Sequence, residues 1–152
     1  MINFIKQLIG VFLLVLIQFT LLDYLFLSRY VDLLLIALFF WSLSKNPKQV
    51  YFLAFFGGIF YDLFSNYPLG SKTFLYLSFS FVLILICQNF LRNLKLKSSF
   101  LLVLLSFSFF ELVKVIFFIA IDIPLAFNVL ILERCLINSL LAMFIILATY
   151  KK

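Results

Sequence analysis

The sequence predicts an all-α integral membrane protein whose six transmembrane helices form one bundle. Of its 152 residues, 66% are hydrophobic and 12% are charged, whereas ordinary globular domains are roughly 45–50% apolar and about 25% charged. A soluble fold of this length has too small an interior to bury so much apolar surface. Glycine and proline are scarce, and the apolar runs do not alternate with polar residues as the strands of a membrane β-barrel do.

Charged and turn-forming residues divide a single transmembrane domain, residues 1–152, into six apolar segments. The first is too long for a signal peptide and has no small-residue cleavage site, so we expect it to be retained. The second has only 12 residues between charges, a length that fits either a short span or a re-entrant segment. Trp41 near its end is typical of an interfacial anchor. The predicted spans are approximately 4–27, 31–44, 50–65, 73–91, 98–121 and 127–150.

The positive charges predict the orientation of these spans. With both termini in the cytoplasm, the outside loops hold Arg29 and Lys72, and all other basic residues outside the spans lie on the inside. This asymmetry follows the positive-inside rule, provided that the second segment crosses the membrane. The lysines are spread over short loops, which does not indicate nucleic-acid binding. The inside residues are Lys6, Lys45, Lys48, Arg92, Lys95, Lys97, Lys151 and Lys152.

The stretch 55–70, FFGGIFYDLFSNYPLG, carries the most distinctive pattern. Ala54, Gly58 and Asp62 are four residues apart and therefore share one helix face. Small residues at this spacing let another helix approach closely in lipid, and a carboxylate there must face protein. A loosely packed span with one tolerated acid is the simpler alternative. We expect a packing or partner-binding surface at Ala54, Gly57, Gly58 and Asp62, and a tight outward turn at Pro68, Leu69 and Gly70.

A second group of polar residues falls at one depth in the outer half of the predicted bundle. A helix rises about 1.5 Å per residue, which places these residues ~18–26 Å from the inner ends of their spans. We expect Asp62, Glu111 and Glu133 to pair there with Lys114 and Arg134. The layer is either an ion-paired device that orders the helices, a small-molecule pocket open to the outside, or a polar docking surface. Its predicted members are Gln18, Asp62, Glu111, Lys114, Glu133, Arg134 and Asn138.

The chemistry-bearing residues do not indicate catalysis. The chain has no histidine, and Cys87 and Cys135 lie in apolar runs, where a free thiol behaves as a small hydrophobe. Neither a metal site nor a disulfide framework is predicted. A bilayer enzyme built on the layer of acids would need a nucleophile with a base partner, and the sequence suggests none. We therefore expect a protein without cofactor, metal or catalytic residues.

The segment from Asp32 to the fourth span resembles the rod shape-determining protein MreD family. That family has an Asp opening a short second span, a basic turn, a Gly-rich helix with an embedded Asp, and a Leu-Gly turn. Asp32, Gly57, Gly58, Asp62, Leu69 and Gly70 stand at those positions. Length and span number agree along nearly the whole chain. The last two spans match less distinctively, so the resemblance assigns no role to their charged residues.

The resemblance implies a fold similar to the substrate-binding membrane subunits of energy-coupling-factor transporters. It also implies a non-enzymatic scaffold in the bacterial cytoplasmic (inner) membrane. The direct partner would be MreC. The actin-like MreB, the glycosyltransferase RodA and a class B penicillin-binding transpeptidase would be indirect partners in peptidoglycan synthesis and control of rod shape.

The alternative is a vitamin-binding subunit of such a transporter, since the fold would be shared. Those subunits dock their energising module through small residues four apart on the first helix. Here Gly10 has Lys6 and Leu14 at the two neighbouring positions, so the docking pattern is absent.

Overall fold

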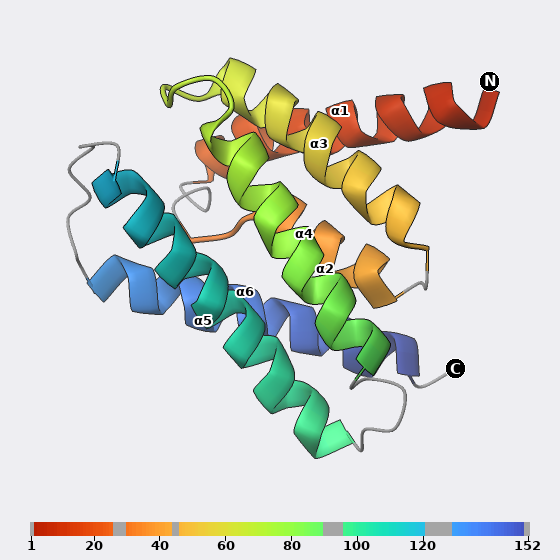
Figure 1. Ribbon diagram of the computed structural model, residues 1–152, viewed down its shortest axis with the longest axis vertical. Coiled ribbons are helices and arrows are strands. Elements are labelled where there is room, and N and C mark those ends of the chain that lie inside the picture. The colour runs from red at the N-terminus through yellow and green to blue at the C-terminus, as the bar shows by residue number, and fades with distance from the viewer. Residues whose placement is uncertain (1, 26–29, 44–45, 90–95, 121–128, 151–152) are drawn as a thin grey trace.

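The computed structural model describes residues 2–25, 30–43, 46–89, 96–120 and 129–150, and these residues form six α-helices (Figure 1). All-helical architecture is therefore as predicted. Two helices contain stretches long and apolar enough to cross a membrane, Ile5–Leu22 and Val103–Ala120. The helices are α1 Ile2–Tyr24, α2 Leu33–Leu43, α3 Pro47–Phe64, α4 Ser71–Asn89, α5 Leu96–Ala120 and α6 Val129–Tyr150.

The starts of α2 and α3 follow from local chemistry. Asp32 precedes α2, and its Oδ1 accepts a hydrogen bond from the Leu35 N–H at 3.0 Å, which is the geometry of an N-cap. Helix α3 begins at Pro47, three residues before the predicted start of its span at residue 50. Proline is favoured in the first helical turn because its missing N–H would have no partner there.

Helices α3 and α4 form a closely packed antiparallel pair, with α1 packed against α3 and with α5 beside α6 (Figure 1). Helix α2 lies behind α4 and contacts α1, α3, α4 and α6. Leu34 and Leu38 of α2 are fully buried. Helix α2 therefore fills the interior of the bundle. Its 11 residues rise only about 16 Å, and its crossing of a membrane stays a prediction.

Candidate functional site

The Asp62 carboxylate joins the end of α3 to the start of α4. Its Oδ2 accepts hydrogen bonds from the Gly70 N–H at 3.0 Å and the Thr73 N–H at 3.1 Å. Its Oδ1 accepts from the Lys72 N–H at 2.9 Å, and the Thr73 hydroxyl donates to Oδ2 at 2.8 Å. The first N–H groups of a helix have no partner within the helix and carry partial positive charge, so a carboxylate there is doubly favourable. Asp62 is buried, as the stripe predicted.

The approach of the two helices depends on Gly58. A Cβ built on Gly58 would lie 2.5 Å from the Thr73 Cα, a backbone atom of α4, so no other residue fits without moving a helix. A Cβ on Gly57 would lie 2.6 Å from a terminal carbon of Leu34 in α2. Of the two expectations for this surface, helix packing is therefore correct within the chain. A partner helix is not needed to explain either glycine, and Ala54 on the same stripe is also buried.

The turn between α3 and α4 has the predicted chemistry. Gly70 has φ +93°, a conformation that residues with a Cβ rarely adopt. The Ser71 N–H donates to the Pro68 carbonyl at 3.1 Å, which closes a β-turn, and the Phe74 N–H bonds the Gly70 carbonyl at 2.9 Å to begin α4. Leu69 at the tip is exposed. This turn brings the Gly70 and Lys72 N–H groups to Asp62.

A second polar network holds the backbone before α2. The Gln18 amide of α1 donates to the Val31 carbonyl and accepts from the Leu33 N–H, both at 2.8 Å. The Asn138 amide of α6 donates to the Tyr30 carbonyl at 3.0 Å and accepts from the Asp32 N–H at 2.9 Å. Two helices far apart in sequence therefore clamp one short segment.

Asp32 connects the same segment to a third helix. Its Oδ2 accepts a hydrogen bond from the Tyr76 hydroxyl of α4 at 2.7 Å. Together with the cap on Leu35, both oxygens of Asp32 therefore have donors. Asp32 was singled out through the resemblance, but nothing in the sequence pattern identified Tyr76 as its partner.

The predicted ion-paired layer forms in part. Glu111 and Lys114 of α5 are buried and form an ion pair one helical turn apart. Asp62 was expected to pair with Lys114 or Arg134, which is wrong, because its oxygens accept the N–H groups of the α3–α4 junction instead. Glu133 was expected in the layer but lies on the exposed face of α6, whereas Arg134 is half-buried.

Gln18 and Asn138, which were predicted to belong to that layer, are both buried. Their partners, however, are backbone groups of residues 30–33 and, for Asn138, also the Arg134 carbonyl, rather than charged side chains. An amide side chain both donates and accepts, so it satisfies a non-helical backbone segment that crosses an apolar interior. Among the residues that the structure describes, Gln18 and Asn138 thus contribute hydrogen bonds to backbone, and Glu111 and Lys114 contribute an ion pair.

A buried cation that the sequence pattern did not predict lies near this network. Lys72, which was expected in an outside loop, is only 6% exposed. Its Nζ lies 4.8 Å from the centre of the Tyr61 ring, 5.6 Å from that of Tyr67 and 5.8 Å from that of Tyr76. The sequence signal was a lysine four residues before a tyrosine in α4, with Tyr61 and Tyr67 on either side of the preceding helix end.

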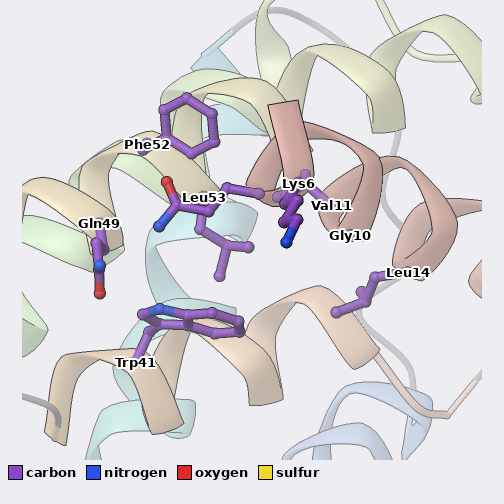
Figure 2. A pocket seen from close by; sticks show the side chains of 9 residues that line it. Lys6, Gly10, Val11, Leu14, Trp41, Gln49, Phe52 and Leu53 are labelled. Atoms are coloured by element: carbon purple, nitrogen blue, oxygen red, sulfur yellow. The ribbon is translucent and has the colours of Figure 1, made fainter. Parts of the chain in front are cut away.

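A separate pocket of about 290 Å³ lies between α1, α2 and α3, at the other end of α3. In Figure 2 the indole of Trp41 forms one wall, with Leu53 and Phe52 from α3 facing it and Leu14 from α1 at the side. Gly10 adds no side chain, and a Cβ there would meet nothing within 4 Å. The pocket suits an apolar group. Its lining residues are Lys6, Gln7, Gly10, Val11, Leu14, Trp41, Gln49, Phe52 and Leu53.

The cysteines give no further site in the described part of the chain. Cys135 is a buried free thiol in contact with the Ser108 hydroxyl at 3.1 Å. The side chain of Cys87 lies outside the described residues. Among the residues that the structure describes, no three His, Cys, Asp or Glu side chains gather as a metal site would require.

Comparison of the whole chain with known protein families, with curated proteins and with solved structures gave no match.

Proposed function

We propose that this chain is a non-enzymatic membrane scaffold of the MreD type that binds MreC and helps control peptidoglycan synthesis and rod shape. The observation that carries the proposal is the use of the motif residues. Asp62 and Gly58 join α3 to α4, and Asp32 joins α2 to α4. The residues that carry the resemblance therefore hold helices of the chain together, and a scaffold requires such a rigid arrangement of helices.

The outer faces of the helices support membrane embedding. Five large apolar residues of α5 are each more than 40% exposed and recur at helical spacing along one face. A continuous apolar stripe of this kind is costly in water and favourable in lipid. The residues are Leu105, Phe109, Leu112, Ile116 and Ile119.

On this proposal the six helices lie in the bacterial cytoplasmic membrane with both termini inside, arranged as in the substrate-binding subunits of energy-coupling-factor transporters. MreC binds laterally, because helix faces are the main surface that the described residues offer. Contacts with MreB, RodA and the class B transpeptidase then pass through MreC. Close packing of small residues and hydrogen bonds between polar side chains, rather than hydrophobic burial, would stabilise a helix contact in lipid.

Site-specific photo-crosslinking in cells tests the proposal. A photoreactive residue is placed at exposed positions of different helices, such as Leu13, Phe81 and Leu112, and at the buried Leu38 as the matched control. We expect crosslinks to MreC from one face and none from Leu38. Affinity purification from mild detergent should also recover MreC. The proposal fails if no position crosslinks MreC and depletion of the chain leaves rod growth unchanged; rescue of vitamin uptake in an auxotroph would instead favour a transporter subunit.

A further inference from the structure

The pocket between α1, α2 and α3 has an apolar interior and a polar rim. Val11 and Leu53 line it and are buried. Lys6 from α1 is exposed and Gln49 from α3 is half-buried, and in Figure 2 these two side chains lie on either side of Leu53 and the Trp41 indole. The ligand that complements such a pocket is amphipathic, with an apolar part inside and a polar group at the rim.

The size and opening of the pocket suit a segment of an acyl chain. Its volume of about 290 Å³ lies at the lower limit of the roughly 300–1,000 Å³ that whole small-molecule ligands occupy. Trp41 is 39% exposed, so the indole wall reaches the surface of the bundle. Gly10 is exposed as well, and it leaves open the space that a side chain would fill. A flexible chain can therefore enter from the surroundings of the helices.

The pocket lies at the end of the bundle that the proposed orientation places in the cytoplasmic half of the membrane. Lys6 stands near the start of α1, Trp41 in the last turn of α2 and Gln49 in the first turn of α3. These helix ends lie on the same side of the bundle as the N-terminus (Figure 1). Tryptophan is enriched at the membrane interface, and the cytoplasmic leaflet carries anionic lipids.

The charges at this end favour an anionic headgroup. Lys6 of α1 and Lys48 of α3 are both exposed there. The acids of α1 and α3, Asp23 and Asp62, stand near the far ends of these helices, about 21–26 Å along them from the two lysines. Asp32 likewise precedes α2, away from its Trp41 end. Basic pockets between transmembrane helices on the cytoplasmic side are typical sites for anionic lipid headgroups.

We propose that this pocket binds one anionic phospholipid. An acyl chain fills the apolar space beside Trp41, and the phosphate at the rim accepts hydrogen bonds from the Lys6 ammonium. A free anion would leave the apolar part of the pocket unused, whereas a phospholipid fills both parts. The inference rests on the proposed membrane embedding and not on binding to MreC.

Quenching of Trp41 fluorescence tests the site. Trp41 is the single tryptophan of the chain, so its emission reports on this pocket. The purified full chain in a neutral detergent is titrated with phospholipids that carry bromine on the acyl chains, which quenches an indole on contact. We expect half-maximal quenching at about fivefold lower phosphatidylglycerol than phosphatidylcholine, as one basic residue near an anionic headgroup predicts. Unbrominated phosphatidylglycerol should reverse the quenching by competition.

Two pairs of variants assign the effect to the pocket. Lys6→Gln should reduce the headgroup preference to less than about twofold, and Lys48→Gln should keep it, because Lys48 is exposed at the same end but does not line the pocket. Gly10→Phe should fill the cavity and weaken quenching by both lipids. Leu13→Phe adds an aromatic ring to an exposed position of α1 outside the pocket and should behave as wild type.

Each outcome decides for or against the site. Equal quenching by the two lipids overturns the proposal, and so does an equal loss of preference in Lys6→Gln and Lys48→Gln, which would assign the preference to diffuse charge. Absence of quenching by either lipid means that a protein segment or detergent occupies the pocket, which also overturns it. If Gly10→Phe fails to fold, the wild-type preference and its loss in Lys6→Gln still decide.

Cloud-point extraction of the same protein separates this failure from failure of the proposed function. A chain that enters the detergent phase but shows no headgroup preference overturns the lipid site alone. A chain that stays in the aqueous phase overturns both the lipid site and the proposed membrane embedding.

Discussion

The Asp62 carboxylate and Thr73 are joined twice, through the Thr73 N–H at 3.1 Å and the Thr73 hydroxyl at 2.8 Å, both to the same oxygen. Thr73 is also the residue whose backbone comes closest to Gly58, one turn before Asp62 on α3. The glycine permits the approach of the two helices and the carboxylate stabilises it. The two features of the motif are therefore one structural device.

Replacing Asp62 with Asn should destabilise the protein by about 2–3 kcal/mol, because charge-assisted hydrogen bonds at a helix start are lost and the amide NH₂ faces N–H donors. Denaturant or thermal unfolding in detergent measures the change. Glu133→Gln is the control, since Glu133 is exposed on α6, and it should change stability by less than 0.5 kcal/mol. Equal losses in the two variants would contradict the capping role.

Alanine substitutions at three glycines should rank by the space available to the new Cβ. Gly58→Ala meets backbone at 2.5 Å and should cost about 2–3 kcal/mol, as overpacking does. Gly57→Ala meets the flexible end of Leu34 and should cost less. Gly10→Ala meets nothing within 4 Å and should stabilise by about 0.5–1 kcal/mol through helix propensity. Unfolding curves of the three variants give the order, and a neutral Gly58→Ala would show that α3 and α4 pack more loosely.

The Glu111–Lys114 pair should show the asymmetry of buried ion pairs. Glu111→Leu alone leaves a buried ammonium and should cost about 3–5 kcal/mol, whereas Glu111→Leu with Lys114→Met should cost far less or stabilise. A double-mutant cycle on unfolding free energies measures the coupling. Additive effects in the cycle would mean that the two side chains do not interact in the folded protein.

Gln18 and Asn138 should be energetically coupled although they lie on the first and last helices. Each clamps residues 30–33, so either Gln18→Leu or Asn138→Leu should cost about 1–3 kcal/mol by leaving backbone groups unsatisfied. Once one clamp is lost, the segment moves and the other clamp stabilises less, which makes the double variant less than additive. Thr20→Val is the control, because its hydroxyl bonds within α1 at an exposed position. If the losses of unfolding free energy in the two single variants add fully in the double variant, the inference that both side chains hold the same segment is wrong.

The local sequence pattern was sufficient to predict burial, a turn or an ion pair where the residues concerned act through their own backbone or within one helix. The stripe of Ala54, Gly58 and Asp62 was predicted to be buried because residues four apart share a face. The tight turn followed from Pro68 and Gly70 standing two residues apart, and Gly70 takes the positive φ that glycine permits. The i, i+3 spacing of Glu111 and Lys114 likewise gave their ion pair.

The partners of the buried polar groups were decided by the tertiary structure. Depth along a span suggested that Asp62 would meet Lys114 or Arg134, but depth says nothing about which helix is adjacent. The carboxylate instead meets the N–H groups that the α3–α4 turn brings to it. Gln18 and Asn138 were placed in the layer correctly, yet their backbone partners depend on where the segment before α2 enters the bundle.

The sequence by itself determined the helical class, the helix positions within a few residues and the burial of the Gly-Asp stripe. These follow from composition and from the 3.6-residue period, which act over short distances along the chain. The tertiary structure decided that Lys72 turns inward to Tyr61, Tyr67 and Tyr76, and that α2 fills the interior. Both depend on which residues far apart in the chain become neighbours, and no periodicity in one segment specifies that.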